Sequence, residues 1–178
     1  MPELAEAEAR RRFTAARVAR LATVDAAGRP HQVPVVFAGY TPEGTEGTLS
    51  GAAGRIVTAV DHKPKTTARL RRLRNIAAHP AVCLLADAYD EDWDQLWWVR
   101  ADGEASVLTA DAADPAVRQA HASAVGLLRA KYPQYRDHPP AGPVIAVTVR
   151  RWSGWQARAE TSGRRTPCTP VVPETHGE

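Results

Sequence analysis

The chain has 178 residues, of which 44% are hydrophobic and 24% charged, and its formal net charge is +3 at pH 7. These values are typical of a globular protein of one domain, large enough to bury a core without disulfide bonds. There is no run of about 18 apolar residues and no apolar stretch near the start, so we expect neither a membrane span nor a secretory signal. Cys83 and Cys168 form no Cys-x-x-Cys pair, which favours a protein of the reducing cytoplasm.

The first part of the chain predicts one helix and two strands. Good helix formers over residues 3–17 indicate a helix with one apolar side. Strands are expected at 18–25 and 32–37, joined by a hairpin turn in which Gly28 is free to adopt a positive φ. Pro34 indicates that the second strand is an edge strand or carries a bulge.

The middle of the chain begins with its least regular stretch, 39–54, for which we expect only one short strand near 48–50. Residues 55–60 are apolar and β-branched and predict a further strand. A helix follows, with Pro64 in its first turn and His79-Pro80 at its end. Its apolar stripe has helical spacing and consists of Leu70, Leu73, Ile76 and Ala77.

Two strands and a long helix come next. The strands are expected at 81–86 and 96–108, with a bend or break in the second at 101–103. Residues 111–131 predict the helix. Its candidate N-caps are Asp111 and Asp114.

The chain ends with a strand at 143–150, an aromatic corner at Trp152 and Trp155, and a polar, Pro-rich tail. The tail has too little apolar surface to order itself, so we expect one folded domain at 1–157 and a poorly ordered segment at 158–178. The strands and helices do not alternate in βαβ order. They therefore predict an α+β fold, an antiparallel barrel or sandwich with peripheral helices.

The common signatures of enzymes and metal sites are missing from the sequence. There is no Gly-rich dinucleotide motif, no Walker A motif and no nucleophile elbow. The six histidines match no metal-ligand spacing. The acidic run at 87–94 lacks the glycine and the distal glutamate of a calcium loop, so a solvated loop is the favoured interpretation and no metal is expected.

A basic segment precedes this acidic run. Residues 62–86 contain no acid, and their fixed positive charges are Lys63, Lys65, Arg69, Arg71, Arg72 and Arg74. Because the segment joins a strand to a helix N-terminus, the two lysines predict a phosphate site. The alternative is a solvated helix face whose arginines pair with the acidic run. Nucleic acid is disfavoured, because no aromatic residue interleaves the cations.

Trp97 and Trp98 form the second unusual feature. On a strand, neighbouring side chains point to opposite faces, so one ring can fill a core while the other needs a different cover. That cover is a partner subunit or a flat aromatic ligand. Simple packing, with one ring at a dimer interface, is the equally favoured alternative.

Several segments resemble a known family, the pyridoxamine 5'-phosphate oxidase-like split β-barrel proteins. Residues 19–31 and 33–37 resemble the opening hairpin of this family. Residues 57–65, 73–76 and 79–82 resemble its cofactor strand and the helix that follows. The actinobacterial subgroup that depends on the deazaflavin coenzyme F420 is resembled by residues 89–93, 96–100 and 151–155. The most specific part is the Lys63-Pro64-Lys65 segment joined to the double-tryptophan strand.

The resemblance implies a six-stranded antiparallel split β-barrel and a homodimer with cofactor sites between the subunits. It implies F420 as cofactor, with FMN as the alternative. Backbone groups of Val57, Thr58 and Ala59 would lie along the ring, and Lys63 and Lys65 would hold the phosphate. Arg71, Arg72 or Arg74 would bind the glutamate tail of the cofactor. Pro34 and Val35 would form an apolar wall, and Trp97 or Trp98 would reach across the dimer to cover the ring.

The implied activity is hydride transfer between F420 and an unidentified small organic substrate. An FMN-dependent enzyme of the same fold is the first alternative, and a non-catalytic carrier or sensor of flavin, F420 or haem is the second. No residue stands out as a general acid or base, so no catalytic side chain is named. Nucleic acid and membrane are not expected as partners.

Overall fold

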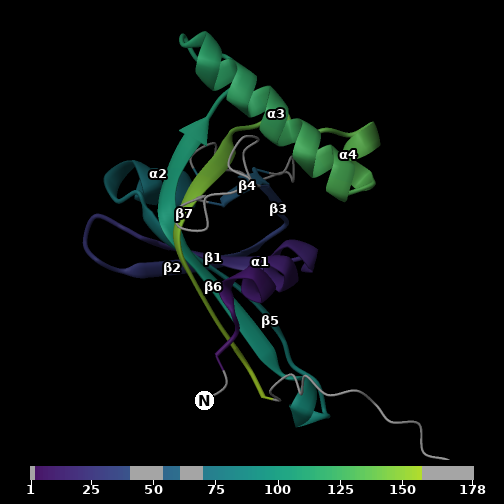
Figure 1. Cartoon of the computed structure of the whole chain (residues 1–178). Coiled ribbons are helices and arrows are strands. Elements are labelled where there is room, and N and C mark those ends of the chain that lie inside the picture. Colours follow the sequence, from purple (N-terminus) through teal and green to yellow (C-terminus); the bar gives the residue numbers. More distant parts are fainter. Residues whose placement is uncertain (1–2, 41–53, 61–69, 158–178) are drawn as a thin grey trace, which may run out of the picture.

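The computed structural model describes residues 3–40, 54–60 and 70–157 (Figure 1). In this part of the chain seven antiparallel strands form one sheet in the order β2-β1-β5-β6-β7-β4-β3. The strands are β1 (Ala19–Val24), β2 (Pro30–Val35), β3 (Ala38–Tyr40), β4 (Arg55–Ala59), β5 (Ala81–Ala88), β6 (Trp97–Leu108) and β7 (Val144–Gln156). The fold is α+β with an antiparallel sheet, as the sequence predicts, but it has one strand more than the six expected.

The sheet is curled because of how its two edges are connected. β2 and β3 lie at opposite edges of the sheet, yet only Val36 and Phe37 separate them in sequence. Three Cα–Cα steps span at most about 11 Å, so the two edges must approach each other. This curl is the half-barrel seen in Figure 1.

The additional strand is β3. The second strand was expected to end at Phe37, with irregular chain from residue 39, whereas Ala38–Tyr40 pairs with β4. Three residues are too few to show a strand pattern, and only the neighbouring β4 defines this one. The short strand expected near 48–50 lies outside the described residues.

The helices are α1 (Glu6–Ala15), α2 (Arg71–Ala78), α3 (Pro115–Lys131) and the single turn α4 (Gln134–Asp137), with a 3₁₀ turn η1 at Trp93–Gln95. Asp114, one of the two expected caps, accepts a 2.8 Å hydrogen bond from the Ala116 N–H at the start of α3. None of the helices in the described segments is long and apolar enough to cross a membrane.

Two expected boundaries were wrong. The helix predicted from Pro64 begins at Arg71, because Leu70 has extended backbone angles (φ −63°, ψ 131°) and acts as its N-cap. The last strand was expected to end at Arg150 with an aromatic corner beyond it. Instead β7 continues to Gln156, because its second half pairs with the first half of β6. Both boundaries depend on tertiary contacts that the local sequence does not contain.

The expected bend in β6 is confirmed. The β6–β7 register shifts between Asp102 and Gly103, leaving Arg150 as an extra residue on β7. A Cβ at Gly103 would clash with the carbonyl oxygen of Thr148 and lie 2.9 Å from Val147 Cγ1. Glycine is therefore required where the two long strands approach most closely.

The core has two parts, one on each face of the curled sheet. The larger lies inside the curl, where α1 and α2 contribute Phe13 and Ile76 to the strand side chains. The smaller lies beneath α3, where Leu128 and Tyr132 pack against Val57 and Ala59 of β4. α3 thus covers the β3–β4 end of the outer sheet face, and residues 98–102 of β6 lie beyond it.

Candidate functional site

The cofactor strand implied by the resemblance is β4, which is buried on both faces. Val57 and Ala59 face α3, while Thr58 alternates with them and points to the opposite face. Thr58 is 1% exposed, and its hydroxyl has no hydrogen-bond partner among the described residues. β3 pairs with β4 only from Arg55 to Val57, so no described strand continues alongside Thr58 and Ala59 on that edge.

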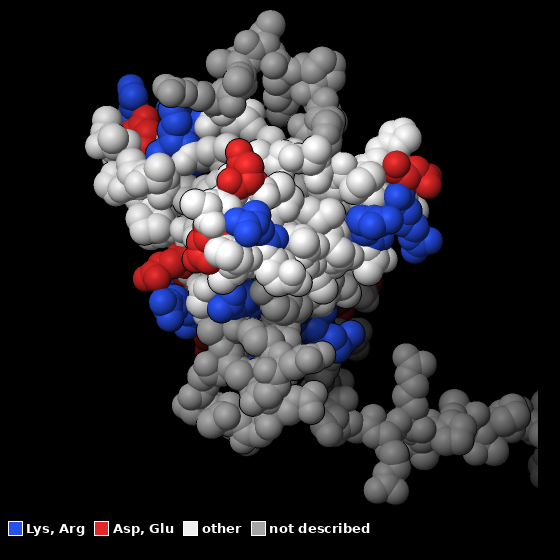
Figure 2. All heavy atoms as spheres, turned by 90° about the horizontal axis from the view of Figure 1, so that it is seen from above, with Lys and Arg blue, Asp and Glu red and all other residues white. Residues whose placement is uncertain are grey.

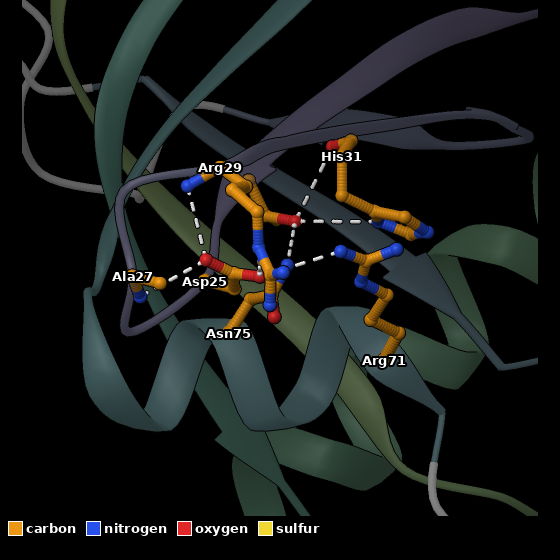
Figure 3. A network of polar contacts seen from close by, with 7 residues as sticks. Asp25, Ala27, Arg29, His31, Arg71 and Asn75 are labelled. Carbon is orange, nitrogen blue, oxygen red and sulfur yellow. Dashed lines mark hydrogen bonds and ion pairs between the residues drawn. The ribbon is translucent and has the colours of Figure 1, made fainter.

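Arg71 of α2 lies at the β1–β2 turn. Arg71 Nη2 is 3.3 Å from Asp25 Oδ2, and Arg29 Nε is 2.9 Å from the same oxygen (Figure 3). Asp25 Oδ1 accepts the backbone N–H groups of Ala27 and Arg29, each at 3.0 Å. The backbone N–H of Arg29 is the largest cause that lowers the pKa of Asp25 to about 2. Asp25 thereby partly neutralises Arg71.

A second contact fixes α2 against the same hairpin. Asn75, 3% exposed, donates a 2.9 Å hydrogen bond from Nδ2 to Thr23 Oγ1 on β1. His31 lies next to this pair, 3.5 Å from Thr23 Oγ1, and its pKa is lowered by burial and by the charges of Arg71 and Arg72. The contacts of α2 with Asp25 and Thr23 were not predicted from the sequence. The one sequence feature that pointed to them is Asn75, a polar residue within the apolar stripe of the helix.

Arg74 has a different environment from Arg71. Its side chain is exposed, and it makes no polar contact with the described residues. Arg72 is half-buried beside it. Since α2 has no acid in its first turn, the helix presents net positive charge on this side. Lys63 and Lys65 lie outside the described residues, and α2 begins at Arg71, six residues after Lys65.

Pro34 and Val35 occupy the edge strand β2, as Pro34 indicates. They point to opposite faces: Val35 is 7% exposed and belongs to the core inside the curl, while Pro34 is exposed. The two residues do not form one apolar wall within a single chain.

Trp97 and Trp98 lie on opposite faces of β6, as expected. Trp97 packs against the inner core, with the Arg12 guanidinium 5.8 Å from its ring centroid. Trp98 lies on the outer face, directly opposite Trp155 of β7. Both rings are far from Thr58. Thr58 is in register with Ile145 and, through it, with Val107, which lies nine residues or about 30 Å along β6 from Trp98.

The outer face around Trp98 contains donors that the fold does not satisfy. Arg100 Nε, Ser153 Oγ and Trp155 Nε1 are buried and have no hydrogen-bond partner in the part of the chain that the structure describes. Arg100 and Ser153 are directly opposite each other on β6 and β7, one row away from Trp98 and Trp155. Buried donors without acceptors are costly, so this cluster is where acceptors from another molecule would be most stabilising.

The described segments offer no metal site and no activated thiol. They contain no group of three or more His, Cys, Asp or Glu side chains placed to hold a metal ion. Burial is the main cause that raises the pKa of Cys83 to about 11, with Asp102 adding to it, so this thiol is protonated and inert near neutral pH.

The acidic run lies at the far end of the β5–β6 hairpin from α2. In the described chain Asp87 of the acidic run forms an ion pair with Arg20, and Arg71 of α2 forms one with Asp25. Neither ion pair joins the acidic run to α2. The view from above shows a mainly uncharged surface with scattered charged side chains rather than one basic patch (Figure 2).

The sequence matches the family model of pyridoxamine 5'-phosphate oxidase over residues 5–156. No curated protein matches the chain significantly. A conserved hypothetical protein from Mycobacterium tuberculosis is similar in structure, with a TM-score of 0.62, 18% identity and 93% coverage of each chain. A FAD-binding protein from Mesorhizobium loti gives 0.59 at 18% identity, covering 86% of this chain and 95% of its own. The heme storage protein HutZ from Vibrio cholerae gives 0.54 at 15% identity, covering 85% and 93%. At these identities the similarities establish the fold alone.

Proposed function

The chain belongs to the pyridoxamine 5'-phosphate oxidase family, and from that premise we propose that it is an oxidoreductase that binds a flavin-type cofactor, specifically the deazaflavin F420. When bound, such a cofactor supplies the hydride chemistry, and the protein binds it, orients it and excludes water. The substrate would be a small organic molecule. No described side chain is placed as a general acid or base, so the proposal names no catalytic residue.

One observation carries the proposal. The edge of β4 at Thr58 and Ala59 has no neighbouring strand among the described residues, and the sequence that follows, from Lys63 into α2, is rich in Lys and Arg. The backbone of Thr58 and Ala59 has no strand beside it on this edge among the described residues, so its polar groups suit the rim of a flat ring, and the Thr58 hydroxyl lies on the same short segment. From Lys63 to Arg74 the sequence has six fixed cations and no acid. A polyanion such as F420, with its phosphate and glutamate tail, uses more of these cations than FMN does.

The proposal requires a homodimer. Trp98 lies nine residues, about 30 Å along β6, from the residue in register with Thr58, so a tryptophan that covers the ring would come from the second copy. The unsatisfied donors around Trp98 support the same arrangement, because an interface on this face would give them acceptors.

A second candidate function is cofactor storage or sensing without turnover. It is favoured by the fold likeness to a FAD-binding protein and to a heme storage protein, and by the absence of an acid–base residue in the described site. The test is a fluorescence and absorbance titration with F420, FMN, FAD and haem, followed by a turnover screen with the preferred cofactor. Saturable F420 binding with turnover supports the first function, and haem or flavin binding without turnover supports the second.

Lys63 and Lys65 provide a sharper test of the phosphate contact. A charge-assisted hydrogen bond to phosphate is worth roughly 1.5–3 kcal/mol, or about one to two decades in affinity. We expect Lys65→Ala, and Lys63→Ala to a lesser degree, to weaken F420 binding by about that factor while melting temperature is unchanged. Arg69→Ala is the matched control and should have less effect. Wild-type affinity in both lysine variants at low salt would place the phosphate elsewhere.

A further inference from the structure

We propose that His31 is a further ligand of the cofactor's anionic tail, and that it binds the tail by taking up a proton. The inference rests on the proposed function, in which the cations from Lys63 to Arg74 hold the phosphate and the glutamate tail of F420. It adds a residue of the edge strand β2 to those cations and couples cofactor binding to pH.

His31 lies where the basic side of α2 meets the β1–β2 hairpin. In the β1–β2 register His31 is opposite Thr23, the residue whose hydroxyl accepts the 2.9 Å hydrogen bond from Asn75 of α2. This bond holds the helix against the hairpin. The Arg71 guanidinium lies between Asp25 and the His31 ring in the close view (Figure 3). Basic side chains from two elements are therefore held at one corner before any ligand binds.

The charges that face His31 in the described chain come from α2. Burial lowers the pKa of His31 most, and the positive charges of Arg71 and Arg72 lower it further. Asp25, the acid of the hairpin turn, forms its own ion pairs with Arg71 and Arg29. The His31 ring is therefore neutral near pH 7 in the free protein, beside cations that attract an anion.

An anion on the α2 arginines reverses this balance. Carboxylates within a few ångströms of an imidazole favour its charged form, and they raise its pKa by about one unit or more. They also offset the charges of Arg71 and Arg72, which hold the pKa of His31 down. Both changes act in the same direction, so His31 takes up a proton as the tail binds and then attracts it. F420 suits such a site better than FMN, because only F420 carries carboxylates beyond its phosphate.

The hydrogen bonds of Thr23 accommodate both protonation states of His31. The Thr23 hydroxyl accepts from Asn75 and lies 3.5 Å from His31 Nδ1 and 3.4 Å from the His31 carbonyl oxygen. A hydroxyl has one proton and two acceptor lone pairs. It donates to Nδ1 when that nitrogen is unprotonated. When Nδ1 carries a proton, the hydroxyl accepts from it and donates to the carbonyl oxygen instead. From β1 the ring thus faces an uncharged group that suits either state, and proton uptake needs no rearrangement of the hairpin.

The test is isothermal titration calorimetry with F420 in buffers of different ionisation enthalpy, which counts the protons taken up on binding. The baseline is the same deazaflavin phosphate without its glutamate tail, because it has the same ring and phosphate. At pH 6.5 we expect the wild type to take up roughly half a proton per chain above this baseline, as for a pKa that rises by about one unit around that pH. Relative to the baseline, the dissociation constant should rise about tenfold from pH 5.5 to pH 8.

Two substitutions at this position separate the charge from the rest of the side chain. His31→Gln should lose the excess proton uptake, bind F420 about tenfold more weakly than the wild type at pH 5.5 and match it at pH 8. His31→Lys has a fixed charge and should remain as tight at pH 8 as the wild type is at pH 5.5, a rescue that a purely structural role would not give. His138→Gln replaces an exposed histidine at the end of α4 and is the control that should behave as the wild type.

The outcomes distinguish the role of His31 from the cofactor assignment. The role of His31 is overturned if the excess proton uptake persists in His31→Gln. It is also overturned if the wild type takes up no more protons with F420 than with the tailless deazaflavin. In both cases F420 binds, so the proposed function stands. A wild type that does not bind F420 at any pH would refute both.

Discussion

The two ends of the sheet differ in how completely one chain satisfies them. At the α3 end the Tyr132 hydroxyl accepts the Phe37 N–H at 3.0 Å and lies 2.7 Å from the Phe37 carbonyl oxygen. Lys131 Nζ donates to the carbonyl oxygens of Thr14 and Ala16, at 2.8 and 2.7 Å, and so closes the end of α1. On the outer face of the tryptophan end three buried donors have no acceptor among the described residues. The α3 end is closed by contacts within a single chain, except at Thr58, and the other end has the features of a surface completed by a second copy.

The exception at the α3 end is informative. Thr58 is buried there, and its hydroxyl has no partner among the described residues. It lies on the strand segment proposed to contact the cofactor ring, whereas the donors around Trp98 lie where a partner chain is proposed.

The largest expected effect is at Tyr132, which joins α3 to the link between the sheet edges. Tyr132→Ala removes a side chain that is 1% exposed and should lower the free energy of unfolding by about 3–5 kcal/mol. Tyr132→Phe keeps the ring and should cost about 1–3 kcal/mol. Urea denaturation measures both. If Tyr132→Phe costs as much as Tyr132→Ala, the ring is not the main contribution and the α3 end is held differently.

Gly103 lies at the boundary between the two ends, where β6 and β7 change register. Gly103→Ala should lower the free energy of unfolding by about 1–3 kcal/mol or more, because the added methyl meets the Thr148 backbone. Gly126→Ala is the matched control. A Cβ at Gly126 has no neighbour within 4 Å, and α3 should gain about 0.5–1 kcal/mol. Equal effects at both glycines would show that the close approach does not limit the sheet.

The positions predicted well from sequence are those with a strong local cause. Gly28 adopts φ 80° in the expected hairpin turn, and Asp114 caps the long helix. Gly103 marks the bend in β6, and β4 extends over nearly the expected residues. In each case neighbouring residues alone limit the backbone.

The positions missed are those set by distant partners. α2 begins at Arg71, where Asn75 reaches Thr23, fifty-two positions away in sequence. β3 exists because β4 lies beside it, and the second half of β7 because β6 does. For the candidate site, sequence pointed to the cations but gave no indication that Asp25 would partly neutralise Arg71.

Trp98→Ala tests whether the tryptophan end is an interface. We expect the dimer dissociation constant to rise by about thirtyfold, as for a central aromatic contact. Val18→Ala is the control, since Val18 is 44% exposed but lies outside this face. Analytical ultracentrifugation measures both. Unchanged association in Trp98→Ala would remove this ring from the interface.

The smallest expected effect concerns Asp25 and the orientation of α2. Its pKa is lowered from 3.8 to about 2, so as the pH falls between these values the unfolded chain takes up a proton that the folded chain does not. The contribution of Asp25 to stability is therefore present above pH 3.8 and is lost toward pH 2. Asp25→Asn should have a slightly lower melting temperature than the wild type at pH 7, and this difference should shrink as the pH approaches 2. A difference that stays constant with pH would show that charge is not its cause.

The most direct test of a cofactor-binding dimer is light scattering with simultaneous absorbance on one chromatographic peak, after incubation with F420. One chain has a mass of 19.3 kDa. The account predicts a peak of twice this mass that carries one F420 per chain. A peak of single-chain mass that carries F420, or a dimer that carries none, would contradict it.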